Sequence, residues 1–144
     1  MSTEENKALV RRFVDEAQSR GNLDAVDELL ASDFVNHSAV PGLPTDRDGV
    51  KQIFTMFRTA YPDLRAVIHD QVAEGDRVVT RKTLHGTHRG ELIGIPPTGK
   101  KVAIEVIDIL RVVSGKITDH WNVVDQLGML QQLGVVPAPD QPTN

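Results

Sequence analysis

The apolar residues of this 144-residue chain change their spacing near residue 62, from the period of a helix to the period of a strand. Three earlier segments carry an apolar stripe at helical spacing: residues 7–20, 23–30 and 48–60. Four later segments have the alternation and turn signals of strands: residues 64–74, 77–88, 102–113 and 116–124. Helices followed by hairpin-linked strands predict an α+β fold with an antiparallel sheet rather than a parallel one.

Turn and cap residues separate these segments. Gly21 ends the first predicted helix, and Asn22 is placed to cap the second one. Residues 34–37 are predicted to be a short extended piece, and residues 38–45, with two prolines and a glycine, a loop. Residues 126–133 are predicted to form a final helical turn.

The predicted strands are long, at about ten residues each, and long antiparallel strands twist and coil. We therefore expect a cone-shaped barrel, made of a curved antiparallel sheet packed against the N-terminal helices. Helices laid across the hollow side of such a sheet leave room for a small apolar molecule. We expect one domain over residues 1–136 and a disordered, proline-rich tail over residues 137–144.

Composition narrows the classes of partner. The net charge is -4 and basic residues do not cluster, so nucleic acid is not expected as a partner. The chain has no cysteine, which excludes disulfides and thiolate metal sites. The polar, acidic start is unlike a signal peptide, and no apolar stretch has the length of a membrane span. We expect a cytoplasmic protein with no membrane partner.

The segment GIPPTGKK, residues 94–101, approaches the spacing of a phosphate-binding loop. However, Lys101 stands where a serine or threonine would hold magnesium, and Pro96 and Pro97 remove two N–H donors. A strand rather than a helix is predicted to follow, which disfavours nucleotide binding. The segment is better interpreted as a connection between strands that forms a rim or lid over a pocket.

The five histidines do not form a metal-binding motif. His85 and His88 are three residues apart in a predicted strand, so their side chains point to opposite faces and cannot chelate one ion. A metal site could only be assembled from distant strands. We therefore expect no metal.

One face of the predicted strand 102–113 is apolar except at a single position. Asp108 interrupts a row that contains Val106 and Leu110. If this row faces the cavity, desolvation raises the pKa of Asp108 and makes it a proton acceptor or donor. Two alternatives remain open: Asp108 forms a structural ion pair with an arginine, or the opposite face of the strand is the buried one.

His120 and Asn122 lie two residues apart in the predicted strand 116–124, so they share a face. Opposite Asp108 across the hairpin, they would form a polar cluster on an apolar wall, with His120 as a general acid or base near neutral pH. The alternative is that this row faces solvent. Without a cysteine or a serine in a nucleophile motif, proton transfer and ligand polarisation are the chemistries that remain.

Three motifs occur in order along the chain: HGTHRGELIGIPPTGKKV (85–102), RVVSGKITDHW (111–121) and DQLGMLQQLG (125–134). Together with FVNHSAVPG (34–42), they resemble the SnoaL-like polyketide cyclases of the nuclear transport factor two-like superfamily. The resemblance implies a cone-shaped α+β fold and a cofactor-independent enzyme. Such enzymes close a ring of a polyketide ester by an aldol step or take part in a related hydroxylation. It also implies a homodimer or homotetramer.

The resemblance places pocket positions on this chain residue by residue. The acid/base aspartate of the cyclases falls at Asn122, whose amide cannot shuttle a proton, and Asp108 on the adjacent strand could replace it. We assign Asp108 and His120 as catalytic candidates. The candidates for substrate binding are Asn36, His37, Val106 and Asn122. Two functions stay open: acid/base catalysis on an apolar, carbonyl-bearing molecule, and small-molecule binding or assembly without catalysis.

Overall fold

The computed structural model describes residues 2–137, so the predicted disordered tail lies outside the described residues except for residue 137. Its helices are α1 (Thr3–Phe13), the π-helix η1 (Val14–Ser19), α2 (Asp24–Leu29), α3 (Arg47–Ala60) and α4 (Gln126–Gln132). Its strands are β1 (Leu30–Asn36), β2 (Arg65–Glu74), β3 (Arg77–Thr87), β4 (Lys101–Val113) and β5 (Lys116–Val124). The predicted α+β class is confirmed.

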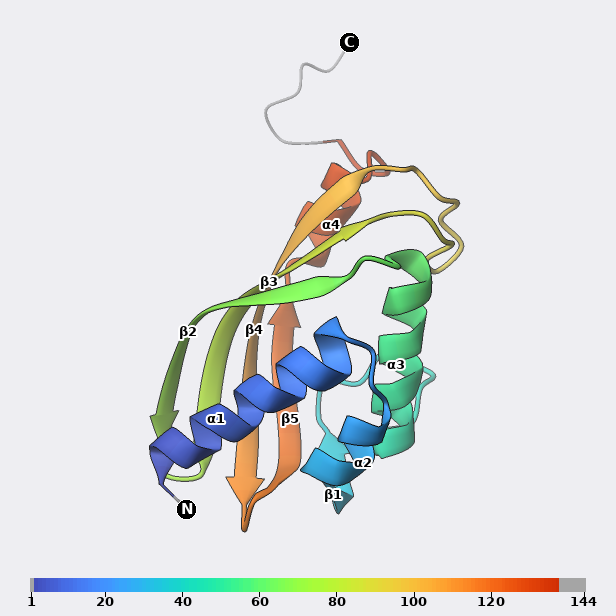
Figure 1. Cartoon of the computed structure of the whole chain (residues 1–144). Coiled ribbons are helices and arrows are strands. Elements are labelled where there is room, and N and C mark those ends of the chain that lie inside the picture. The colour runs from blue at the N-terminus through green and yellow to red at the C-terminus, as the bar shows by residue number, and fades with distance from the viewer. Residues whose placement is uncertain (1, 138–144) are drawn as a thin grey trace.

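The five strands form one curved sheet in the order β1-β5-β4-β3-β2. Strands β2 to β5 pair antiparallel, as predicted, but β1 pairs parallel with β5, so the sheet is mixed. The prediction of a barrel is wrong in one respect, because β1 and β2 are the two edges and do not pair, which leaves the sheet open. Figure 1 shows the helices lying on the open side, where α1 and α2 pass in front of the sheet and α3 stands beside them.

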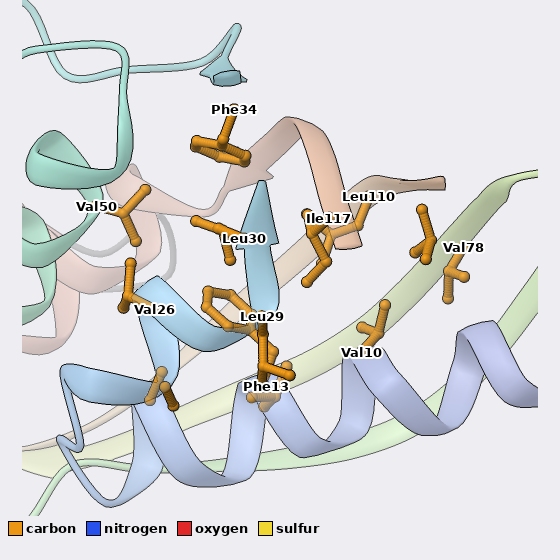
Figure 2. Close-up of a cluster of buried hydrophobic side chains, with 14 residues drawn as sticks. Val10, Phe13, Val26, Leu29, Leu30, Phe34, Val50, Val78, Leu110 and Ile117 are labelled. Atoms are coloured by element: carbon orange, nitrogen blue, oxygen red, sulfur yellow. The ribbon is translucent and has the colours of Figure 1, made fainter. Parts of the chain in front are cut away.

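Helix α1 begins with a capping box, in which Ser2 and Glu5 satisfy each other's backbone N–H groups. Its inward stripe then places Val10 and Phe13 in a core shared with Leu110 of β4 and Ile117 of β5. Figure 2 shows these side chains meeting between α1 and the sheet. Burying each such side chain contributes about 1.5–3 kcal/mol, so this cluster fixes α1 against the sheet.

The predicted helix 7–20 is one continuous segment whose last part widens into the π-helix η1. There the backbone N–H of Arg20 donates to the carbonyl of Asp15, five residues earlier, at 3.1 Å. The wider turn places Gln18 on the inner side of the molecule, while the Ser19 hydroxyl accepts from the backbone N–H of Ala66 on β2 at 2.8 Å. Such single π-turns are frequent at functional sites.

Candidate active site

A cavity of about 410 Å³ is bounded by the helices, the inner face of the sheet and the segment before β4. Its wall is mainly apolar, and typical contributors are Phe13, Phe34, Phe54, Val106 and Leu110. Leu92 and Ile93 reach the cavity from the connection between β3 and β4. Residues 94–101 connect β3 to β4 and lead into a strand, as predicted, but the cavity-lining residues of this connection are Leu92 and Ile93, which precede GIPPTGKK.

The register of the sheet brings three of the predicted residues to one wall of the cavity. Asp108 of β4 lies directly opposite Asn122 of β5, and His120 is its diagonal neighbour, opposite Leu110. All three line the cavity, together with Asn36 from β1 and the predicted Val106. Asp108 is 2% exposed, so the alternative in which the opposite face of its strand is the buried one is wrong. His120 and Asn122 line the cavity, so the alternative in which their row faces solvent is wrong as well.

Asp108 forms a buried ion pair with Lys82 of β3. The Lys82 Nζ lies 2.8 Å from Asp108 Oδ2 and donates to Gln18 Oε1 at 2.8 Å. Because an unpaired charge is costly to bury, the ammonium group stabilises the ionised form of the carboxyl group. The alternative of a basic partner is therefore correct, with lysine in place of arginine.

The second carboxylate oxygen of Asp108 is free. Asp108 Oδ1 is buried and has no hydrogen-bond partner among the described residues. Lys82 thus holds one oxygen while the other remains an unused acceptor beside the cavity. A buried acceptor without a partner costs about 1–3 kcal/mol, so a ligand hydrogen at this atom is energetically favoured.

Lys82 and Gln18 were not predicted as site residues. Lys82 is the single charged residue in the inward row of β3, which also contains Val78, Thr80 and Leu84. An isolated charge in an apolar row is the same signal that identified Asp108, so the sequence did contain the evidence for Lys82. Gln18 carries no such signal, because its inward position depends on the π-helical turn of η1.

His120 is held by Asn36 and is neutral. Its Nδ1 lies 2.9 Å from Asn36 Oδ1. The pKa of His120 is lowered to about 4, mainly by burial; Asp108 opposes this shift, whereas Lys82 and His37 contribute to it. The expected titration near neutral pH is therefore not found, and at pH 7 the ring is available as a proton acceptor rather than as an acid.

His37 lies outside the cavity, although the neighbouring Asn36 lines it. Its Nε2 is 2.8 Å from Asp119 Oδ2, and its ring stacks on Trp121 with centroids 4.6 Å apart. Trp121 and Asp119 alternate with His120 along β5, so they point to the opposite face of the sheet. The structure therefore separates His37 from the other predicted substrate-binding residues.

Asn122 presents its side chain to the cavity, while its backbone N–H donates to the Ser38 hydroxyl at 3.0 Å. No group of three or more His, Cys, Asp or Glu residues within residues 2–137 is arranged to hold a metal ion. None of the helices in this range has the length and apolar content needed to cross a membrane.

Known proteins resemble this chain in sequence and in fold. The model of the SnoaL-like polyketide cyclase family matches residues 8–133. The aklanonic acid methyl ester cyclase DauD of Streptomyces sp. (strain C5) is 34% identical over 131 residues, covering 88% of this chain and 80% of that protein. The nogalonic acid methyl ester cyclase of Streptomyces nogalater is 32% identical, with 86% and 93% covered. The structure of TsrD from Streptomyces laurentii superimposes with a TM-score of 0.85 at 26% identity, covering 94% of this chain and 99% of that chain.

The fold and the site define a class of α+β proteins in which a curved sheet and N-terminal helices enclose an apolar cavity with a small polar wall. The family match covers most of the chain, and both relatives exceed 30% identity over most of both lengths. The chain belongs to the SnoaL-like polyketide cyclase family.

The buried ion pair predicts a large effect of removing one partner only. Lys82→Met leaves the Asp108 carboxylate buried without a counter-ion, so we expect the free energy of unfolding to fall by about 3–5 kcal/mol at pH 7. The double variant Lys82→Met/Asp108→Leu removes both charges and should recover most of this loss. Urea unfolding measures the free energy of unfolding of each variant. The control is Arg81→Met, which removes one partner of the exposed ion pair with Asp70 and should change this free energy little. Additive losses in the double variant would contradict the pairing.

The lowered pKa of His120 predicts a loss of stability in acid. The His120 ring takes up a proton near pH 6.5 in the unfolded chain and at a pH of about 4 in the folded protein. Between these two pH values the unfolded state therefore binds more protons. The free energy of unfolding therefore falls as the pH is lowered through this window, by on the order of 3 kcal/mol from this group. Urea unfolding between pH 6.5 and 4 should show a shallower pH dependence for His120→Phe than for the wild type. Identical slopes would show that His120 is not buried as a neutral ring.

Proposed function

We propose that this protein is a cofactor-independent enzyme that moves protons on an apolar, carbonyl-bearing, polyketide-like molecule, with aldol ring closure as the reaction. The observation that carries the proposal is the free Oδ1 of Asp108, an ionised and buried carboxylate beside an apolar cavity of about 410 Å³. The names of the relatives support it, since they are cyclases of aklanonic and nogalonic acid methyl esters.

Asp108 is the proposed base. Its Oδ1 takes the proton of a carbon next to a carbonyl group, and the enolate that results attacks a second carbonyl carbon of the same molecule. The new alkoxide then takes the proton back from Asp108, so the carbon–carbon bond forms without net loss of a proton. Lys82 supplies the counter-charge of this carboxylate, because its ammonium group lies 2.8 Å from Oδ2.

The side-chain amides of Asn36 and Asn122 are proposed to stabilise the enolate. Both residues line the cavity. The Oδ1 atom of Asn36 already accepts hydrogens from the protein, which leaves its NH₂ group to donate. Fixed donors placed where negative charge develops lower the barrier, because they need no rearrangement during the reaction.

A second function, ligand binding without chemistry, is favoured by Asn122, because an amide stands where the resemblance places the acid/base aspartate of the cyclases. The two functions differ in one outcome. Both predict saturable binding of an aromatic ligand, and only the first predicts a product of changed connectivity.

The catalytic proposal predicts a loss of turnover in Asp108→Asn. We expect kcat to fall by about 10²–10⁴-fold on a polyketide methyl ester that the wild type cyclises, because general-base catalysis contributes a factor of this size. Product formation is followed by mass spectrometry together with chromatography, since ring closure by an aldol step conserves mass. The matched control is Asp119→Asn, which changes a carboxylate on the opposite face of the sheet and should keep the wild-type rate. Equal rates for Asp108→Asn and the wild type would remove Asp108 from the mechanism.

We also propose that a second copy of this chain covers the outer face of the sheet. Directly paired residues form an apolar row across four strands: Val72, Val79, Ile109 and Trp121. Ile107 and Val123 form a second pair beside it, and Val123 is 76% exposed. Basic and acidic residues such as Arg81 and Asp119 surround these rows. In a copy related by a two-fold rotation, the basic residues of one chain can face the acidic residues of the other.

We propose the cytoplasm as the location, since a chain without cysteine needs no oxidising compartment.

Self-association predicts that a charge introduced on this face dissociates the oligomer. Val123→Asp should shift the molar mass in solution to that of the monomer, because it places a carboxylate in an apolar contact. Leu127→Asp, at a similarly exposed apolar position on α4, is the control and should leave the mass unchanged. Light scattering coupled to size exclusion measures both. A wild-type protein that is monomeric at all concentrations would exclude this proposal.

A further inference from the structure

We infer that the polar wall of the cavity selects ligands by the hydrogens that the ligand donates: it binds a phenol or an enol, held between Asp108 Oδ1 and His120 Nε2. The inference rests on the proposed function and deepens it by naming the class of group that the substrate presents. Two hydrogen bonds carry it: one joins the backbone N–H of Ser38 to Asn36 Oδ1, and the other joins Asn36 Oδ1 to His120 Nδ1.

The backbone N–H of Ser38 fixes the orientation of the side-chain amide of Asn36. The backbone N–H of Ser38 lies 3.0 Å from Asn36 Oδ1 and can only donate. The atom that it meets must therefore be the amide oxygen, because the amide nitrogen would oppose one hydrogen with another. The orientation of Asn36 is thus set by a backbone group whose own hydrogen cannot move.

The hydrogen bond to Asn36 fixes the tautomer of His120. Its Nδ1 lies 2.9 Å from the same oxygen, which carries no hydrogen. Nδ1 must therefore carry the hydrogen of this pair. A neutral ring has one such hydrogen, so Nε2 bears a lone pair, and no hydrogen bond within residues 2–137 uses it.

The two carboxylate oxygens of Asp108 have different surroundings. Lys82 occupies Asp108 Oδ2, and the ionised carboxylate has no hydrogen of its own. Its Oδ1 is therefore an acceptor without a partner among the described residues. Lys82 directs a second hydrogen to Gln18 Oε1, so its two contacts are to Oδ2 and Oε1 and leave Oδ1 without a partner among the described residues.

The sheet places these two acceptors on one wall. Asp108 and His120 are diagonal neighbours on β4 and β5, and both line the cavity. A carbonyl or ether oxygen of a ligand would meet two lone pairs here, whereas a hydroxyl group satisfies either atom. Asp108 Oδ1 is a buried acceptor, so the site rejects an analogue that lacks the donor, because this oxygen then remains desolvated and unpaired.

This polarity matters for the reaction. A 1,3-dicarbonyl compound in its enol form carries on oxygen the hydrogen that Asp108 removes. The O–H bond breaks, the Asp108 O–H bond forms, and the enolate is the same one that removal of the C–H proton produces. The site therefore selects substrates that are already enolised or that carry phenolic hydroxyl groups beside the reacting carbonyl.

Matched probes test the inference without turnover. We compare 1,3-dihydroxynaphthalene with 1,3-dimethoxynaphthalene, which keeps the ring and the oxygens but has no hydrogen to donate. Calorimetric titration of the wild type should show at least tenfold tighter binding of the dihydroxy probe. The ratio of the two probe affinities should fall toward one in His120→Phe and in Lys82→Met/Asp108→Leu. It should stay at the wild-type value in Asp119→Asn. Equal affinities of the wild type for the two probes, or no binding of either, would overturn the inference.

A spectroscopic measurement keeps the test independent of variant folding. The ¹⁵N chemical shifts of His120 in the wild-type protein should be those of a neutral ring protonated on Nδ1. Asn36→Leu should release this preference toward the Nε2-protonated form. A wild-type ring protonated on Nε2 would refute the inference. Preference for the dihydroxy probe without any turnover would instead count against the proposed function alone, whereas turnover with equal probe affinities would count against this inference alone.

Discussion

The ion pair between Lys82 and Asp108 determines what the cavity can do. Two charges lie almost fully buried in a mainly apolar space, which is costly unless each has a close partner. The pair meets this condition through one contact of 2.8 Å and a third group, Gln18, which shares the ammonium group. Three elements supply these residues: η1, β3 and β4. The site is therefore a property of the packed layers, and the helix that carries Gln18 contributes a partner for Lys82.

The same layers explain why the two titratable groups of the wall differ. Asp108 has a cation beside it, whereas the nearest partner of His120 is the neutral amide of Asn36. Burial without a counter-ion disfavours the charged form of His120 and lowers its pKa to about 4. A carboxylate and a neutral imidazole on one wall both accept protons, and neither needs a metal or an external base to do so.

Periodicity was sufficient to predict most of the fold, because the change from helical to strand spacing reflects which faces are buried. It could not predict the open edge of the sheet or the parallel pairing of β1, since both depend on which segments meet in space. Strand parity placed Asp108, His120 and Asn122 on one wall correctly. His37 was assigned through its neighbour Asn36, and alternation along the extended chain sends it to the other face. The tautomer of His120 requires coordinates, since it depends on the N–H of Ser38.

The amide at position 122 does not deprive the cavity of a proton acceptor. Asp108 and Asn122 are directly opposite each other in the register of β4 and β5, so their Cβ atoms are about 4.5–5.5 Å apart, as in any antiparallel pair. A carboxylate on either strand therefore reaches nearly the same part of the cavity. What changes is its surroundings, because a group at position 108 also comes within reach of Lys82 on β3. Moving the acid/base group by one strand would leave a carboxylate on the same wall of the cavity while adding a cation as its partner. The structure thus supports a cyclase-like role for a chain that lacks the aspartate expected on its last strand.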